Sequence, residues 1–427
     1  MTATAANAPW TGKLRTMFSD DRSFWRLAAA VLGLVALLKG IRIPNLWSAT
    51  QAMVNYDHGT VKRGLFGATF GHWFHLERYV RFTMFSSVLL LMFIGLLVWL
   101  VEGSGIFSRV ELGVPVVVFA SSYAVTYLAS LIGYLDIPLG ILAVGTLLVR
   151  NTKLRFLLAV PVCIVALMIH ELFFIVFLPV ILFSFVLDAA LMEDSRGRLR
   201  IWAMCAVLFC ISGAVTVRFA QDKLITMAEA KALYAEDAAR ADFPVKPDFF
   251  WVLTRSSGKN LRVMKIVYAN RAWDFYLMMN VVRLFAVGTL LMLPILAIIR
   301  TFPDRPTRTV LKFAAFVAAF SPLLMHVIGW DNARWNALVC LTMFLVLLTL
   351  TRSLPVPSIA LSAGYRNAAI LFIAISMATG GGLLDDQEIK TFPFASPARE
   401  MLNMMRHGRW DPPAPDPHPI DTSSALN

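Results

Sequence analysis

Eleven apolar segments alternate with polar ones along the chain, and this alternation predicts the class of the protein. The apolar segments cover residues 24–42, 81–101, 112–134, 137–149, 156–169, 172–191, 201–217, 275–299, 313–329, 336–351 and 359–380. Apolar runs of about 18 residues or more are typical of transmembrane helices. The pattern therefore predicts an all-α, polytopic integral membrane protein with about eleven transmembrane helices, within a range of about ten to twelve.

Two of these segments, 137–149 and 156–169, are each short for a full crossing and flank the basic turn 150–155. We interpret them as a hairpin that is either re-entrant or strongly compressed in the membrane. In both cases the two ends of the hairpin return to the same side, so the topology downstream is unchanged.

The polar segments divide the rest of the chain. Residues 1–22 predict a cytoplasmic tail, because a cleavable signal peptide would begin its apolar core sooner. Residues 23–382 then form a single transmembrane domain, with a first outer loop at 43–80 and a long outer loop at 218–273, both carrying short helices. The polar, Pro-containing segment 383–427 is expected to be an extracytoplasmic tail that is partly disordered.

Composition agrees with this class and excludes others. The chain is 58% hydrophobic and only 15% charged, whereas soluble domains are about a quarter charged. Outer-membrane barrels alternate apolar and polar residues and lack long apolar runs. The four cysteines all lie in apolar segments, without the spacing of metal ligands to histidine, and are interpreted as buried packing residues.

The net charge of +12 is interpreted as a topology signal, and no nucleic-acid partner is expected, because many basic residues flank the apolar segments. With the N-terminus inside, the Lys/Arg-rich segments 150–155, 192–200 and 300–312 all fall on the cytoplasmic side, as the positive-inside rule requires. We therefore expect a multi-pass protein of a bacterial inner (plasma) membrane with a cytoplasmic N-terminus.

This topology places several ionisable residues together on the outer side. They are Asp57, His58, Asp136, His170, Glu171, His326, Asp331 and Arg334. Ionisable residues at membrane depth are costly and are functional candidates by default. A polar cavity that opens outward is therefore expected.

Each of these residues also has a structural alternative. Asp136 precedes Ile137-Pro138 and could cap the next helix. His170 and Glu171 could make an interhelical hydrogen bond, and His326 could be a satisfied packing residue. Asp331 and Arg334 have the spacing to pair with each other at the start of a helix.

Asp57 is the strongest candidate for chemistry. It lies among four glycines and is followed by Lys62 and Arg63, and Arg and Lys are natural clamps for phosphate. A carboxylate beside a bound phosphate could remove a proton from an acceptor hydroxyl. We assign catalysis to Asp57, His170 and Glu171. We assign substrate binding to His58, Lys62, Arg63, Asp136, Arg262, Arg283, Asp331 and Arg334.

Arg262 and Arg283 belong to the second outer loop and the span that follows it. Arg262 continues a helical spacing from Arg255 and Lys259, and Arg283 lies inside an apolar run. The structural alternative for Arg262 is a solvated basic face or a contact with lipid headgroups.

The layout resembles that of GT-C glycosyltransferases, with an acidic residue in the first outer loop, a further long outer loop and outer-face cations. Segment 62–67, His170-Glu171 and segment 331–335 are also similar to motifs of bacterial envelope-polysaccharide proteins. The resemblance implies transfer of a sugar from a polyprenyl-phosphate carrier to an acceptor at the extracytoplasmic face, so the partners would be membrane lipid and a polyprenyl-phosphate-linked sugar. It implies Asp57 as the catalytic base.

The sequence departs from that pattern in two respects. The first loop lacks a paired-acid motif, because His58 follows Asp57, and the Trp-Trp-Asp signature of oligosaccharyl transferases is missing. No cofactor is predicted, and dependence on a divalent metal stays open. Two other functions stay open as well: a transporter or flippase for a lipid-linked or anionic solute, and a glycan acyltransferase with His170 as base.

Overall fold

The computed structural model describes residues 21–57, 59, 61–108, 110–220, 225–254, 257–271, 275–329, 331–354, 361–378, 402 and 406. Within these residues every regular element is a helix, as predicted. The expected tails at 1–22 and 383–427 lie almost entirely outside the described residues.

All eleven apolar segments contain helix. The bundle consists of α2 (Asp21–Gly40), α6 (Tyr79–Gly103), α7 (Val110–Ser121), α8 (Tyr123–Ser130), α9 (Asp136–Leu148), α10 (Thr152–Ile169), α11 (Leu172–Val176), α12 (Leu178–Leu191), α13 (Ser195–Ala220), α17 (Phe275–Arg300), α18 (Arg305–Phe320), η3 (Ser321–Val327), α19 (Asn332–Ser353) and α20 (Ala363–Ala378), with the short η2 (Ile106–Ser108) after α6. Eight helical stretches in the described residues are long and apolar enough to cross a membrane, or nine if α7 and α8, bent by 44°, form one span. The chain is therefore an α-helical membrane protein. The two remaining segments, α9 and α20, are shorter apolar helices.

Two helices begin earlier than their apolar patterns predict, because polar caps lie upstream. Asn151 accepts a hydrogen bond from the backbone N–H of Leu154 at 3.0 Å, so α10 begins at Thr152 and has 18 residues. The expectation that both arms of the hairpin are short is therefore wrong for α10. In the same way Asp304 caps α18, whose first turns are formed by part of the basic segment 300–312.

Helix α19 lies at the centre of the bundle. About 94% of its most apolar stretch is buried, against 17% for α2 and 22% for α6. It packs against α17, α18, α12 and α8, and the ring of Phe344 stacks on Phe119 with centroids 4.0 Å apart. A helix surrounded by others positions its first turn firmly, and that turn carries Asp331 and Arg334.

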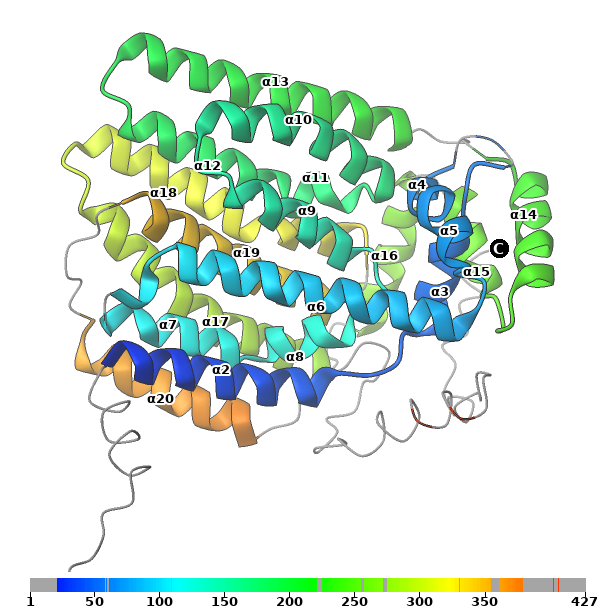
Figure 1. Ribbon diagram of the computed structural model, residues 1–427, viewed down its shortest axis with the longest axis horizontal. Helices are drawn as coiled ribbons and strands as arrows, with labels where there is room; N and C mark the ends of the chain where they lie inside the picture. Colours follow the sequence, from blue (N-terminus) through cyan, green and yellow to red (C-terminus); the bar gives the residue numbers. More distant parts are fainter. Residues whose placement is uncertain are drawn as a thin grey trace, which may run out of the picture.

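The described residues of the two long polar segments form one structure, which we call the cap (the described residues of 45–79 and 225–271). Its helices are α3 (Leu46–Met53), α4 (Gly64–Phe66), η1 (Gly67–Gly71), α5 (His72–Phe74), α14 (Met227–Arg240), α15 (Pro247–Thr254) and α16 (Ser257–Arg271). These helices gather at one end of the bundle, at the right in Figure 1, whereas the α12–α13 and α17–α18 loops lie at the other end.

Contacts between the two halves hold the cap together. The backbone N–H of Lys246 donates to Thr50 Oγ1 at 3.0 Å, and the N–H of Tyr79 donates to Asp242 Oδ1 at 2.8 Å. Trp47 meets Phe249 edge to face at 5.5 Å. The first and second predicted outer loops therefore lie on the same end of the bundle.

Candidate functional site

A buried ion pair joins the first turns of α9 and α19. Arg334 Nη2 donates to Asp136 Oδ2 at 2.6 Å, and Arg334 Nε donates to Asp136 Oδ1 at 3.3 Å. Arg334 Nη1 also donates to Asp331 Oδ2 at 3.2 Å, which confirms the pairing predicted from their spacing. The side chains of Arg334 and Asp136 are 8% and 1% exposed. Asp136 thus pairs with a distant arginine, and its side chain does not cap α9.

Aromatic rings enclose the guanidinium of Arg334. Its Cζ lies 5.0 Å from the ring centroid of Tyr134 and 4.7 Å from that of Trp335. The Tyr134 hydroxyl in turn accepts a hydrogen bond from Asn45 Nδ2 at 2.8 Å, at the start of α3. A cation over aromatic faces is stabilised electrostatically, more so when it is desolvated. This arrangement fixes Arg334 and connects it to the cap.

A second polar cluster lies where α10 ends and α11 begins. Glu171 accepts two hydrogen bonds from Arg63, from Nη2 at 2.6 Å and from Nε at 3.2 Å. Arg63 adopts a left-handed backbone conformation with φ of 64°, which is uncommon outside glycine. The bidentate pair therefore holds the α3–α4 loop against the end of the membrane-spanning bundle.

The surroundings of Glu171 and His170 set their protonation states. Burial alone would raise the pKa of Glu171, but the charge of Arg63 and the neighbouring His170 hold this pKa well below its usual range. Burial, followed by the charge of Arg63, lowers the pKa of His170. Glu171 is therefore a carboxylate and His170 a neutral imidazole at physiological pH.

Two neighbouring groups contact Nδ1 of His170. The backbone N–H of Leu172 donates to His170 Nδ1 at 3.1 Å. Glu171 Oε2 also lies 3.3 Å from this nitrogen. A proton on Nδ1 would donate to that carboxylate, whereas a proton on Nε2 would leave Nδ1 to accept from Leu172. In both tautomers Nδ1 is engaged by protein groups.

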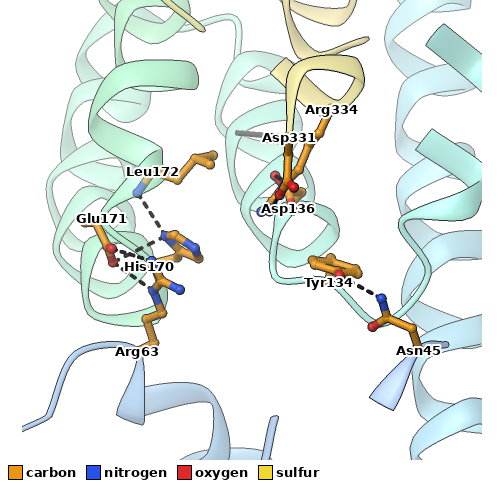
Figure 2. A network of polar contacts seen from close by, with 9 residues as sticks. All are labelled: Asn45, Arg63, Tyr134, Asp136, His170, Glu171, Leu172, Asp331 and Arg334. Atoms are coloured by element: carbon orange, nitrogen blue, oxygen red, sulfur yellow. Dashed lines mark hydrogen bonds and ion pairs between the residues drawn. The ribbon is translucent and has the colours of Figure 1, made fainter. Parts of the chain in front are cut away.

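The two clusters lie at the same end of the bundle, as Figure 2 shows. Helix α11 follows Glu171 directly and contacts both α10 and α19. The charge of Arg334 also contributes to the lowered pKa of His170, so the clusters are close enough to interact electrostatically. The structure thus brings Arg63, Asp136, His170, Glu171, Asp331 and Arg334 to one polar region.

Asp57 lies in the same loop as Arg63, but its charge acts on α14 of the cap. Its carboxylate is exposed and accepts a hydrogen bond from Asn55 Nδ2 at 2.6 Å. Its charge acts on Asp237 and Arg240 of α14. The half-buried Lys62 follows in the same loop. His58 lies outside the described residues.

The two remaining candidates are Arg262 and Arg283. Among the described residues, neither contacts the clusters around Arg334 and Glu171. Arg262 is exposed on α16. Arg283 is half-buried on α17, where its charge acts on the hydroxyl of Tyr123 in α8.

A further polar network was not predicted as a group. Asn332 Oδ1 lies 2.6 Å from His326 Nδ1 and accepts from the Tyr268 hydroxyl at 2.8 Å, and Asn336 Oδ1 lies 3.0 Å from His326 Nε2. Tyr268 comes from α16 of the cap, so only the tertiary structure brings its hydroxyl to Asn332. Asn336, an amide inside an apolar segment, was the signal that sequence reasoning passed over.

The described residues contain no group of three or more His, Cys, Asp or Glu side chains suited to hold a metal ion. The sequence matches no protein-family model, and no curated protein or solved structure is detectably similar to it.

Proposed function

We propose that this protein is a membrane glycosyltransferase or polymerase that uses polyprenyl-phosphate-linked sugars at the extracytoplasmic face of a bacterial inner membrane. One observation carries the proposal: an exposed carboxylate, Asp57, belongs to a loop that Arg63 anchors onto Glu171 at the polar end of the bundle. A carrier lipid in the membrane would present its phosphate at this depth. The same loop supplies both a base and cations.

The proposed reaction needs a base and a site for the leaving phosphate. Asp57 takes the proton of an acceptor hydroxyl, and that oxygen forms a bond to the anomeric carbon of the donor sugar. The bond between this carbon and the phosphate oxygen breaks, and polyprenyl phosphate leaves with the electron pair. Lys62 and Arg63 stabilise the negative charge on that phosphate.

The other residues position these groups. Glu171 orients Arg63 through two hydrogen bonds. His170, whose Nδ1 contacts Leu172 and Glu171, uses Nε2 to contact a sugar or phosphate oxygen. Arg334, with Asp136 and Asp331, holds the ends of α9 and α19 beside this region.

A transporter or flippase is the second candidate, and the break between α7 and α8 favours it. The two helices meet at 44°, and the half-buried Arg283 acts on Tyr123 at the start of α8. Transporters use interrupted helices to line their substrate sites. This function would depend on Arg283 and would not need a base at Asp57.

The discriminating experiment uses purified protein in proteoliposomes. Undecaprenyl-phosphate carrying a radiolabelled hexose or pentose is supplied with an oligosaccharide acceptor, and transfer of label to the water-soluble product is measured. Asp57→Asn should reduce transfer at least about 100-fold, which is the usual size of a general-base contribution. The control Asp248→Asn changes another exposed carboxylate of the cap and should leave transfer unchanged.

Equal transfer by wild type and Asp57→Asn would contradict the proposed role of Asp57. Movement of the labelled lipid between leaflets without product, abolished by Arg283→Gln and retained by Asp57→Asn, would support the transporter function in place of transfer.

A further inference from the structure

A cavity of about 250 Å³ lies at the end of the bundle opposite the cap. Its ten lining residues come from the ends of α6, α9, α10, α12 and α19 and include Arg150, Arg155, Asp188 and Arg352. Pockets for drug-sized ligands measure about 300–1,000 Å³. The size therefore suits a small anion or a lipid headgroup better than a large organic ligand.

The lining has an excess of positive charge. Three of the ten lining residues are arginines, and Asp188 is the one carboxylate among them. That carboxylate is already engaged, because it accepts from the Thr152 hydroxyl at 2.6 Å and forms an ion pair with Arg155. Arg150 and Arg352 are therefore not neutralised by a carboxylate in the lining.

Buried donors provide independent support for a ligand. Arg155 is only 5% exposed, and its Nε has no hydrogen-bond partner within the described part of the chain. The same holds for Nε of Arg352. A buried N–H without a partner is costly, by about 1–3 kcal/mol. An anion that accepted from these groups would remove that cost.

Access and shape also fit an anion. Arg150 is exposed and donates to the carbonyl oxygen of Gly103 at 3.2 Å, so it lies at the outer edge of the cavity, whereas Arg155 lies deep in the protein. The 18-residue helix α10 begins beside the cavity, because Arg155 of its first turn belongs to the lining, and the start of a helix carries partial positive charge. Arg352 donates to the carbonyls of Leu147 and Leu148 at the end of α9, which holds its guanidinium in place.

We propose that this cavity binds the phosphate group of an anionic ligand through Arg150, Arg155 and Arg352. Guanidinium groups match phosphate oxygens in geometry and form charge-assisted hydrogen bonds with them. Basic pockets between transmembrane helices bind the head groups of anionic lipids. The phosphate belongs either to such a lipid or to a soluble phosphorylated molecule, and the site is independent of the proposed transferase site.

The test uses full-length protein purified in a neutral detergent. In one arm the thermal unfolding midpoint is measured with inorganic phosphate against chloride at equal ionic strength. In the other arm, protein in phosphatidylcholine nanodiscs receives increasing fractions of phosphatidylglycerol, and retained lipid is counted by intact-complex mass spectrometry. Stabilisation by phosphate identifies a soluble ligand, and retention of phosphatidylglycerol alone identifies a lipid headgroup.

Arg150→Gln is the main variant, because its exposed position makes loss of folding unexpected. It should weaken phosphate or lipid binding about tenfold, the effect of removing one charge-assisted hydrogen bond. Arg196→Gln is the matched control. Arg196 is exposed in the first turn of α13 and is not part of the lining, so its loss should leave binding unchanged.

Two results would overturn the proposal. One is a wild-type protein whose unfolding midpoint is not raised by phosphate and that retains no phosphatidylglycerol. The other is an equal loss of binding in Arg150→Gln and Arg196→Gln, which would mean that the charged surface attracts anions without a specific site.

Discussion

Arg334 and Asp136 are 198 residues apart in the chain, yet their side chains lie 2.6 Å apart in the protein interior. This pair joins the start of the central helix α19 to the start of α9. Buried charges are tolerated when they are paired and hydrogen-bonded, and removal of one partner leaves an uncompensated charge. Loss of either partner alone should therefore be strongly destabilising, whereas loss of both should not.

The substitution Arg334→Ala should lower the free energy of unfolding by about 3–5 kcal/mol, because Asp136 would remain buried without its partner. The double variant Asp136→Leu, Arg334→Met should recover most of that loss, since no unpaired buried charge remains at Asp136. Thermal and denaturant unfolding in detergent micelles measures both. Arg262→Ala, on the exposed face of α16, should change stability by less than about 0.5 kcal/mol.

The left-handed conformation of Arg63 leads to a second prediction. Arg63→Gly and Arg63→Ala both remove the ion pair with Glu171, but only glycine adopts a positive φ at little cost. The alanine variant should therefore be less stable than the glycine variant, by about 1 kcal/mol. At Lys265, inside the helix α16, the order should reverse. The same order at both positions would contradict the conformation described for Arg63.

Asp237 should make the stability of the cap depend on pH. Burial, together with the nearby Glu236 and Asp57, raises the pKa of Asp237 to about 6 despite its bond with Arg240. In an unfolded chain the pKa is about 3.9. Between these values the folded state binds more protons, so stability is highest below about pH 4 and falls as pH rises to about 6.

The expected loss is about 3 kcal/mol for a shift of this size. Amide hydrogen exchange across residues 227–254, corrected for the intrinsic effect of pH, measures it. Asp237→Asn should remove the dependence. If the asparagine variant keeps the same pH profile, another group is responsible.

Helix packing around Gly40 gives a fourth prediction. A Cβ at Gly40 would collide with the backbone carbonyl of Thr126 in α8, whereas one at Gly95 in α6 would meet nothing. Gly40→Ala should therefore separate α2 from α8 and destabilise the protein by about 1–3 kcal/mol. Gly95→Ala should be neutral or slightly stabilising. Equal unfolding midpoints for the two variants would contradict this contact.

The orientation in the membrane is the fifth prediction. A phosphatase reporter fused after Asp242, in the cap, should be active outside the cell membrane, and a fluorescent reporter fused after Arg198 should be active in the cytoplasm, as the distribution of Lys and Arg requires. The reverse result would place the cap in the cytoplasm and remove the proposed reaction from the extracytoplasmic face.

The apolar pattern predicted the helices and their order, because a stretch of about 20 apolar residues is stable in lipid only as a helix. It also placed Asp136, His170, Glu171, Asp331 and Arg334 at helix ends. It did not predict where α10 and α18 begin, because the caps Asn151 and Asp304 extend these helices into polar sequence. Local chemistry in the chain was enough to predict the Asp331–Arg334 pair.

The long-range partners were decided only by the tertiary structure. Arg63 was predicted to hold phosphate, and the fold gives it Glu171 as a partner 108 residues away. Asp136 had the position of a helix cap, and packing gives it Arg334. Hydrophobicity determines which segments enter the membrane, but it does not specify which of them pack together. The choice of neighbours therefore depends on side-chain packing and on the pairing of charges, neither of which is visible in a pattern of apolar and polar positions.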